Sequence, residues 1–360
     1  MSTFSRYVLR VFFSQMALLL VSFTALLQVF DLLSNSIEVL KRGDGHMSAL
    51  ALYAVLRVPE IVSFLTPFVV LLATLMTLSR LERDNEILAF KAAGAPYNAV
   101  LLSFLPAVLL VGIAHFLLAD QVVPRAINAM VQRDIYIDRD SRDDNAAVFI
   151  QDGRSVVEVT SVGKYGSTLK DMRIYERGDN GVLVRVRRAS EASYDTKQRQ
   201  WTLSGVWTTS IVPDQPSQAV FSPLMNWETT LTPAEFSNLI ELPQAMTLAK
   251  IWSFATSADV GVRPTYFYEA WLQKRFALPV SSILMILLAA PVAHSLYRRD
   301  RGMAAGMAIG FGLGFLYFIC DGLVMSLGET GAVPPVVAAW MPILVFASVG
   351  GAWLIRLEGY

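Results

Sequence analysis

Residues 78–96 read LSRLERDNEILAFKAAGAP, a short charged segment between two long apolar segments. Acidic residues such as Asp84 and Glu86 crowd its first turns, where negative charge stabilises the N-terminus of a helix. Gly94 suits the position that follows a helix, because glycine adopts a left-handed backbone without strain. The segment therefore predicts a helix over residues 81–94.

This predicted helix carries apolar side chains as well as charges. Leu88 lies on one apolar stripe, and Phe90 lies on another side of the helix. Two explanations stay open from the pattern alone. The helix could lie on the surface of a bilayer, as amphipathic helices do, or it could dock into a second protein.

The segments on either side of it are long enough to cross a membrane. A membrane-spanning helix needs about 20 mostly apolar residues, and 54% of this 360-residue chain is hydrophobic whereas only 17% is charged. Six segments meet the requirement, at about residues 11–30, 52–79, 98–119, 272–296, 303–327 and 333–355. The chain thus divides into three spans in residues 1–119, a polar middle in residues 120–270, and three spans in residues 271–360.

Basic residues indicate which side of the membrane each segment faces. They precede the first span, follow the second and fourth spans, and close the sixth: Arg6, Arg10, Arg80, Arg83, Lys91, Arg298, Arg299, Arg301 and Arg356. Because basic loops stay in the cytoplasm, both termini and the charged segment are expected there, and the polar middle is expected outside. A cleaved signal peptide in place of the first span is the alternative, but no small-residue cleavage site follows the apolar run.

The polar middle has the pattern of an antiparallel β-domain. From about residue 145 to 233, short alternating runs surround turn signals such as Asp152-Gly153 and Asn180-Gly181. This pattern predicts a sandwich or an open jelly-roll. Such a domain could bind a lipid or a partner strand at an open edge, or it could be an ordinary sandwich with a filled core.

Several kinds of chemistry have no support in the sequence. The three histidines, His46, His115 and His294, are far apart and form no metal-binding motif. The chain has neither a phosphate-binding P-loop nor a Gly-x-Ser-x-Gly nucleophile motif. Its net charge of zero gives no electrostatic reason to expect a nucleic-acid partner. We predict no metal, no cofactor and no enzymatic activity; Cys320 and His115 are expected to serve packing, with a proton relay as the alternative for His115.

Residues 78–96 resemble the cytoplasmic coupling helix of the LptF/LptG family, the permeases of the lipopolysaccharide export machine. The similarity extends over nearly the whole chain and includes VPEIVSFLTPF (58–68), VVPRA (122–126) and CDGLVMSLGETGAVPPVVAAWMP (320–342). The last of these stretches looks more like the G-type than the F-type subunit. The resemblance implies an α-helical membrane protein of six transmembrane helices (3+3) with an inserted periplasmic β-jelly-roll-like domain.

The resemblance also implies a transport mechanism in the bacterial inner membrane. An F-like and a G-like permease would form a cavity that opens sideways to the outer leaflet. A separate LptB-like ATPase dimer would grip one coupling helix from each permease, so that ATP and Mg²⁺ bind to that partner and not to this chain. Lipopolysaccharide would be squeezed toward the periplasmic β-domains and an LptC-like membrane-anchored protein. An LptA-like bridge would then carry it toward the outer membrane.

Particular residues match the family's sites. The predicted contacts with the ATPase are Asp84, Glu86, Leu88 and Phe90, with Glu86 at the position of the family's acidic residue. Lys41 and Arg42, on a loop expected in the periplasm, match a basic pair there. Such cations would bind the phosphates of the substrate through charge-assisted hydrogen bonds.

The chain departs from the family at two positions. Gln28 and Glu60 occupy places where the family's type member has lysines, so part of the phosphate site could lie on the second permease. The cations that could replace them are Arg57, Arg125 and Arg133, although each also suits a contact with lipid head groups or a stalk. The predicted substrate-binding set is Lys41, Arg42, Gln28 and Arg133.

A stripe of glycines marks the fifth span. Gly302, Gly306, Gly310 and Gly314 are four residues apart and lie near one helix face, which lets helices approach closely. The family places its first and fifth spans at the lateral gates of the cavity, so we predict that this stripe packs at a gate. Close packing within the chain's own bundle is the alternative.

Two other functions compete with transport. The chain could be a non-transporting membrane sensor or scaffold whose periplasmic β-domain binds a ligand. It could also be a membrane-embedded hydrolase that uses Asp321, but no partner base is evident. A copurified ATPase would favour the transporter.

Overall fold

The chain forms two compact units in the computed structural model, which describes residues 3–43, 46–92, 94, 100, 102–133, 135–136, 148–163, 166–178, 181–196, 198–211, 218–233, 236, 242–256, 263–297 and 303–358. The helical unit comprises residues 1–137, 243–255 and 266–360. The sheet unit comprises residues 138–242 and 256–265. Residues 120–137 and 243–255, which the sequence assigned to the polar middle, thus cluster with the helices.

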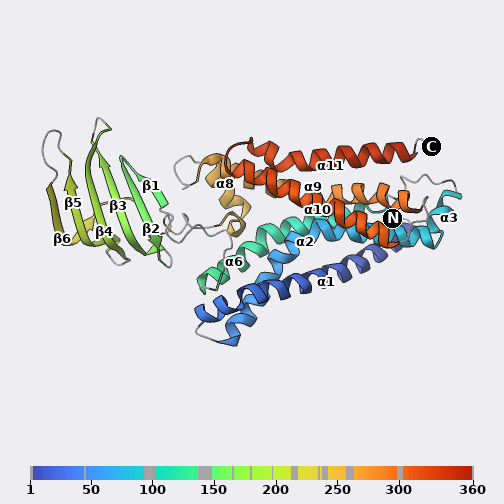
Figure 1. Cartoon of the computed structure of the whole chain (residues 1–360), viewed down its shortest axis with the longest axis horizontal. Helices are drawn as coiled ribbons and strands as arrows, with labels where there is room; N and C mark the ends of the chain where they lie inside the picture. Colours follow the sequence, from blue (N-terminus) through green and yellow to red (C-terminus); the bar gives the residue numbers. More distant parts are fainter. Residues whose placement is uncertain are drawn as a thin grey trace. The chain divides into compact units, whose positions relative to one another are not determined.

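Six helical segments are long and apolar enough to cross a membrane, as the sequence predicts. They are α1 (Thr3–Arg42), α2 (Met47–Arg83), a continuous run of α5 (Leu105–Leu117), the π-helix η1 (Leu118–Val122) and α6 (Val123–Gln132), then α9 (Thr265–Tyr297), α10 (Met303–Glu329) and α11 (Pro335–Glu358) (Figure 1). The 40 residues of α1 extend about 60 Å, twice the thickness of the hydrocarbon core. The sequence located the apolar part of α1 but not the full helix.

The helical unit is built around α2. Of an 18-residue apolar window of α2, 78% is buried. Leu71 and Leu72 are completely buried in a core that also contains Val108 of α5, Leu288 of α9 and Tyr317 of α10. The apolar residues of α2 are spread around the whole helix and do not favour one face. The helix can therefore be buried on all sides within this core.

The glycines of α10 pack against α2. A Cβ atom on Gly310 would lie 2.2 Å from Cδ1 of Leu75, and one on Gly314 would lie 2.6 Å from Cδ2 of Phe68. Only glycine fits at these two positions without a shift of the neighbouring side chains. Gly310 and Gly314 therefore serve close packing within the chain, and Gly302 lies outside the described residues. A role at a lateral gate stays a prediction.

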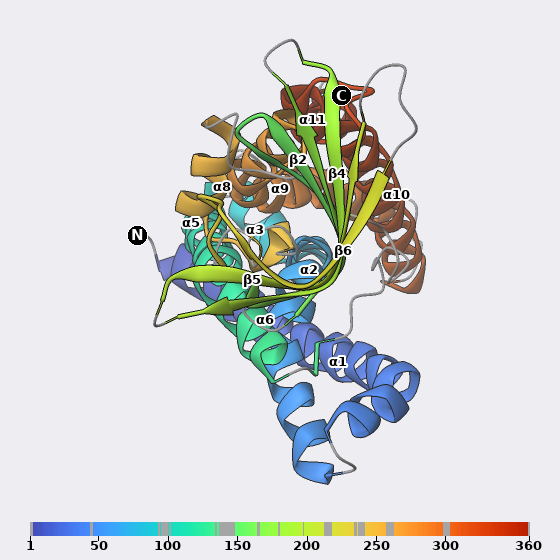
Figure 2. The ribbon, with the colours of Figure 1, turned by 90° about the vertical axis from the view of Figure 1, so that its left-hand side faces the viewer.

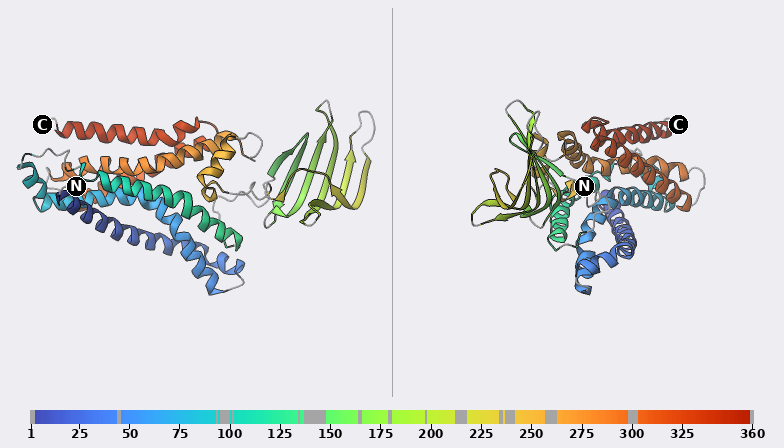
Figure 3. Two further views of the ribbon diagram at one scale, coloured as in Figure 1. Left: turned by 180° about the vertical axis from the view of Figure 1, so that it is seen from behind. Right: turned by 60° about the vertical axis from the view of Figure 1, so that its left-hand side comes forward.

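The two ends of the helical unit differ. At one end, called here the α3 end, lie the short helix α3 (Glu86–Ala92), the start of α1 and the end of α11 (Figure 1). At the other end, called the hairpin end, α1 and α2 form a tip that diverges from α9, α10 and α11 (Figure 3). Two short elements, η3 (Pro243–Ala245) and α8 (Leu248–Thr256), belong to the helical unit as far as Ala255.

The inserted β-domain is antiparallel, as predicted. Its strands are β1 (Val148–Asp152), β2 (Ser155–Val162), β3 (Thr168–Arg177), β4 (Leu183–Asp195), β5 (Gln200–Ser210) and β6 (Gln218–Trp227). They form one twisted sheet in sequential order β1-β2-β3-β4-β5-β6 (Figure 2). Asp152 pairs with Ser155 across the turn at Gly153, whose φ is 58°, so this predicted hairpin is confirmed.

The inner face of this sheet is filled. Trp201 is 1% exposed, and its indole N–H donates to the carbonyl of Leu231 at 2.9 Å. Phe236 completes the cluster, with its ring centroid 5.3 Å from that of Trp201. The described strands contain no second sheet of the kind a sandwich would need. Residues that follow β6 close the core instead, a long-range arrangement that alternation along one strand does not reveal.

Candidate substrate and coupling sites

The segment predicted as one helix over residues 81–94 is split in two. α2 continues to Arg83, a turn follows, and α3 begins at Glu86. Asn85 in this turn has a φ of 57°, a left-handed conformation that asparagine tolerates better than most residues. Gly94 has a φ of 86°, which agrees with its predicted place after the helix. The Asp84-Asn85 pair was the available signal for the break, since both residues favour turns.

Helix α3 is held against the start of α1. The hydroxyl of Tyr7 donates to a carboxylate oxygen of Glu86 at 2.9 Å. The rings of Phe4 and Phe90 stack with centroids 4.4 Å apart. Ile87, which the sequence analysis did not include among the contact residues, is buried against the helical core. Two of the four predicted coupling residues, Glu86 and Phe90, therefore contact α1 of their own chain.

The other two predicted coupling residues are accessible. Leu88 is 58% exposed on α3. Asp84 is exposed in the turn before α3, and its carboxylate lies 3.8 Å from the Nε of Arg80. An apolar side chain on α3 and an acidic side chain in the turn before it are thus exposed at the α3 end, while Glu86 and Phe90 hold α3 against α1. This arrangement suits the docking of a second protein.

The predicted substrate cations lie at the hairpin end. Lys41 and Arg42 are exposed in the last turn of α1, where Arg42 forms an ion pair with Glu38. Arg42 also donates to the backbone carbonyl of Tyr136 at 3.4 Å. Because Tyr136 follows α6 closely, the structure brings the end of α1 beside the segment that begins with the exposed Arg133.

Gln28 does not belong to this group. It lies 13 residues before Lys41, which corresponds to about 20 Å along a helix. Both polar atoms of its amide are buried, and neither has a hydrogen-bond partner in the described part of the chain. Of the predicted substrate residues, Lys41 and Arg42 therefore lie beside the segment that begins with Arg133. Gln28 lies farther back along α1 and does not join them.

A polar cluster between α1 and α2 was missed by the sequence analysis. Asp31 accepts hydrogen bonds from the hydroxyl of Tyr53 at 2.7 Å and from the amide of Asn35 at 3.1 Å. Arg57 pairs with Glu60 and lies 3.5 Å from Asp31. The signal in the sequence was that polar residues recur three or four positions apart in each helix, an interval that places them on one helix face. Two carboxylates neutralise Arg57, so it is a poor substitute for a phosphate-binding lysine.

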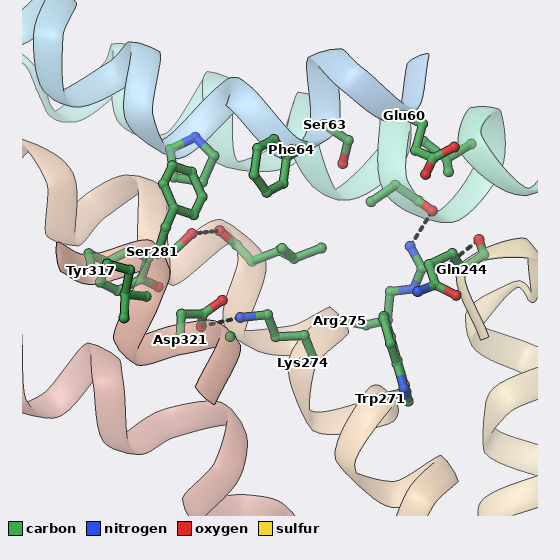
Figure 4. A pocket seen from close by; sticks show the side chains of 17 residues that line it. Glu60, Ser63, Phe64, Gln244, Trp271, Lys274, Arg275, Ser281, Tyr317 and Asp321 are labelled. Atoms are coloured by element: carbon green, nitrogen blue, oxygen red, sulfur yellow. Dashed lines mark hydrogen bonds and ion pairs between the residues drawn. The ribbon is translucent and has the colours of Figure 1, made fainter. Parts of the chain in front are cut away.

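A cavity of about 490 Å³ lies between α2, η1, α9 and α10 (Figure 4). Arg275 is 6% exposed and donates to the carbonyls of Ala119, Met246 at 3.0 Å and Gln244 at 3.3 Å. Lys274 forms an ion pair with Asp321 across the cavity. Asp321, considered above for a hydrolase, is thus bound by a cation.

His115 lies in the interior of the helical unit. His115 is 2% exposed, and its Nε2 lies 3.3 Å from the hydroxyl of Ser63. This geometry fits the packing role expected for His115. Within the residues that the structure describes, no group of three or more His, Cys, Asp or Glu side chains could hold a metal ion.

Comparison with known proteins agrees with this architecture. The family model described as lipopolysaccharide export system permease LptF/LptG matches residues 6–356. The chain belongs to the LptF/LptG family. It is therefore a transmembrane permease of the ABC-type Lpt transporter, and it is not itself the ATPase.

Individual relatives cover most of the permease. The protein named lipopolysaccharide export system permease protein LptG from Escherichia coli (strain K12) is 23% identical over 345 residues, which is 94% of this chain and 92% of the relative. The protein of the same name from Haemophilus influenzae is 21% identical over 320 residues, or 85% of each chain. These relatives and the family match leave no support for a non-transporting scaffold.

Proposed function

We propose that this permease takes the G-like position in a pair with an F-like second permease. In this proposal an LptB-like ATPase dimer binds α3, and the extracted lipopolysaccharide passes to an LptC-like protein and an LptA-like bridge. Membership in the family supports an assembly of this kind. The G-like position is supported by the relatives named LptG, which match at 23% and 21% identity.

The observation that carries the coupling role is the anchoring of α3. Its exposed Leu88 is available to a partner, while Glu86 and Phe90 fix the helix to α1. A turn of two residues, Asp84 and Asn85, joins it to α2. A force applied to α3 would therefore move α1 and α2 together, and these helices carry the predicted substrate site at their far end.

The proposed topology places both termini and α3 in the cytoplasm and the sheet unit in the periplasm. The start of α1 and the end of α11 lie at the α3 end (Figure 1), as an even number of crossings requires. Basic residues such as Arg6, Arg80 and Arg356 belong to the same end, which agrees with the positive-inside rule.

The proposed substrate site is the cationic rim at the hairpin end. Lys41, Arg42 and Arg133 are exposed there, and each provides hydrogen-bond donors that match the phosphate oxygens of lipopolysaccharide. The neutralised Arg57 and the uncharged Gln28 contribute less. The second permease would then supply the remaining cations.

The coupling role is tested by a charge placed on α3. We expect Leu88→Asp to reduce copurification of the ATPase with the permease pair by about tenfold or more, because docking would bury an unpaired carboxylate. Ile355→Asp is the matched control, since Ile355 is 72% exposed at the end of α11 and lies at the same end of the unit. Full retention of the ATPase by Leu88→Asp, or equal loss in both variants, would contradict a docking site on α3.

A further inference from the structure

The return of the chain from the sheet unit is anchored to the span that precedes that unit. Residues 243–248, called here the return segment, follow the sheet unit and belong to the helical unit. The carbonyl of Ala245 accepts a hydrogen bond from the side-chain amide of Asn128 on α6 at 3.2 Å. The carboxylate of Asp120 on η1 accepts from the N–H of Leu248, the first residue of α8, whose N–H has no partner within its own helix. The outgoing and the returning chain are thus joined at one place.

Arg275 of α9 lies at the centre of these contacts. Its guanidinium donates to the carbonyl of Ala119 on η1 and to the carbonyls of Gln244 at 3.3 Å and Met246 at 3.0 Å on the return segment. Arg275 is 6% exposed and Met246 is completely buried, and Figure 4 shows Arg275 next to Gln244. The planar fork of an arginine can serve several acceptors that lie in different directions. One side chain therefore ties α9, η1 and the return segment together, an arrangement called here the Arg275 joint.

The motif VVPRA explains why the Ala119 carbonyl is free to accept this bond. In an α-helix that carbonyl would accept from the N–H of Val123, but this N–H donates to Leu118 because η1 is a π-helix. In a π-helix the carbonyl would accept from residue 124, which is proline and has no N–H. Both helical donors are therefore lost, and Arg275 replaces them. The motif thus provides the acceptor on which the joint depends.

The joint forms part of the wall of the cavity between α2, η1, α9 and α10. Ala119, Gln244 and Arg275 all line this cavity, and so does Glu60. Glu60 stands where the type member of the family has a lysine, so the cavity belongs to the region in which substrate contacts are expected. A lipid in this region would lie beside the segment through which the chain returns from the sheet unit.

We propose that Arg275 is a positioning residue for the transfer of lipopolysaccharide from the helical unit to the sheet unit. The joint fixes one attachment of the sheet unit at the wall of the cavity that the lipid leaves. Without it, the tether between the sheet unit and α9 lengthens, which lowers the effective concentration of the receiving domain at the cavity. Arg275 acts through backbone carbonyls, because its terminal nitrogens already bind them and its Nε is buried. This role rests on the proposed export function, in which the lipid is passed toward the β-domain.

The test captures lipopolysaccharide at two places in the full permease complex, reconstituted with its ATPase in vesicles that contain lipopolysaccharide. A photoreactive side chain replaces either Phe64, which is 58% exposed and lines the cavity, or Ile150, which is partly exposed and packs against the core of the sheet. With ATP, Arg275→Met should reduce capture at 150 by about tenfold, the equilibrium worth of one hydrogen bond to a charged group. Capture at 64 and the basal ATPase rate should not change.

The other outcomes are equally informative. A loss of capture at 64 as well as at 150 would overturn the proposal, because Arg275 would then bind the lipid itself. If the unmodified complex captures no lipid at 150 with ATP, the passage to the β-domain fails, and the role of Arg275 fails with it. Capture at 150 that is present but insensitive to Arg275→Met leaves the export function intact and refutes the joint alone.

Two further variants separate the joint from its charge and from general stability. Arg275→Lys keeps the positive charge, but one ammonium group cannot reach the carbonyls on both sides, so capture at 150 should fall as in Arg275→Met. Full rescue by lysine would contradict the proposal. Leu288→Ala, in the buried core of the same helix, should destabilise the unit and yet leave the ratio of capture at 150 to capture at 64 unchanged in the folded complex. An equal fall of this ratio in Leu288→Ala would reduce the effect to a loss of stability and refute the joint.

The motif gives an independent test. Pro124→Ala adds an N–H that the carbonyl of Ala119 can accept in place of Arg275, so the joint should weaken without a loss of thermal stability in detergent. Capture at 150 should fall, though by less than in Arg275→Met, because the two carbonyls of the return segment keep their donor. A variant that unfolds no earlier but transfers less lipid reports positioning, which a merely structural role would not produce. Unchanged capture in Pro124→Ala would count against the proposal.

Discussion

Helices α1 and α2 are both long and apolar, yet the fold uses them differently. The apolar window of α2 is 78% buried, whereas that of α1 is only 11% buried. α1 leaves large side chains exposed along its length, among them Leu18, Val21, Leu26, Phe30 and Leu33. In a bilayer, lipid tails are as apolar as leucine, so exposure of this kind carries no penalty. Hydrophobicity therefore places both helices in the membrane but does not tell which one forms the centre of the fold.

The polar residues of the two helices show a similar contrast. Arg57 of α2 pairs with Glu60 and lies beside Asp31. Lys41 and Arg42, at the end of α1, are exposed. Both arginines have an ion-pair partner, but the side chain of Arg57 is 14% exposed whereas that of Arg42 is 40% exposed, so exposure distinguishes them. The comparison predicts that α2 variants affect stability and that variants at the end of α1 affect lipid binding.

The largest expected effect is on the core. Leu72→Ala on α2, where the side chain is completely buried, should lower the free energy of unfolding by about 2–5 kcal/mol because it leaves a cavity. Leu26→Ala on α1, where the side chain is 51% exposed, should cost less than about 1 kcal/mol in the isolated chain. Thermal unfolding of the purified permease in detergent measures both. Equal losses would show that α1 is packed as tightly as α2.

The next effect concerns lipid capture. Lys41→Ala together with Arg42→Ala should reduce lipopolysaccharide retained by the purified complex about tenfold, or roughly 1.4 kcal/mol, because exposure weakens each lost phosphate contact. The basal ATPase rate should not change directly. Arg57→Met should leave retention per folded complex unchanged, since the charge of Arg57 is already neutralised. A loss of retention in Arg57→Met alone would move the substrate site from α1 to α2.

The smallest effect concerns the contact between the two helices at the hairpin end. Tyr53→Phe removes the hydroxyl that donates to Asp31 at 2.7 Å, and Asn35 remains as a second donor. We expect a loss of about 1 kcal/mol in the free energy of unfolding, measured as for Leu72→Ala. An unchanged stability would mean that apolar contacts alone hold the end of α1 against α2.

Much of the fold could be predicted from local patterns. The apolar segments revealed six helices that are long and apolar enough to cross a membrane, and the Asp152-Gly153 turn revealed a hairpin. The break at Asn85 was not predicted, because the charges around it also suit one continuous helix. In the candidate sites, the family resemblance indicated Glu86 and Phe90, but their contacts with Tyr7 and Phe4 join segments about 80 residues apart and leave no local signal.

The sequence by itself determined how many times this chain crosses the membrane and that a β-domain interrupts the crossings. A bilayer requires a helix of minimum length with all backbone hydrogen bonds satisfied internally, and a strand requires alternation of period two. Only the tertiary structure decided which charges are paired. Lys274 and Asp321 are 47 positions apart, and nothing near either residue reveals the other. Such contacts depend on distance in space, which packing around α2 sets, and so Arg57 also reaches Asp31 of α1 and is 14% exposed whereas Arg42 is 40% exposed, although both are arginines.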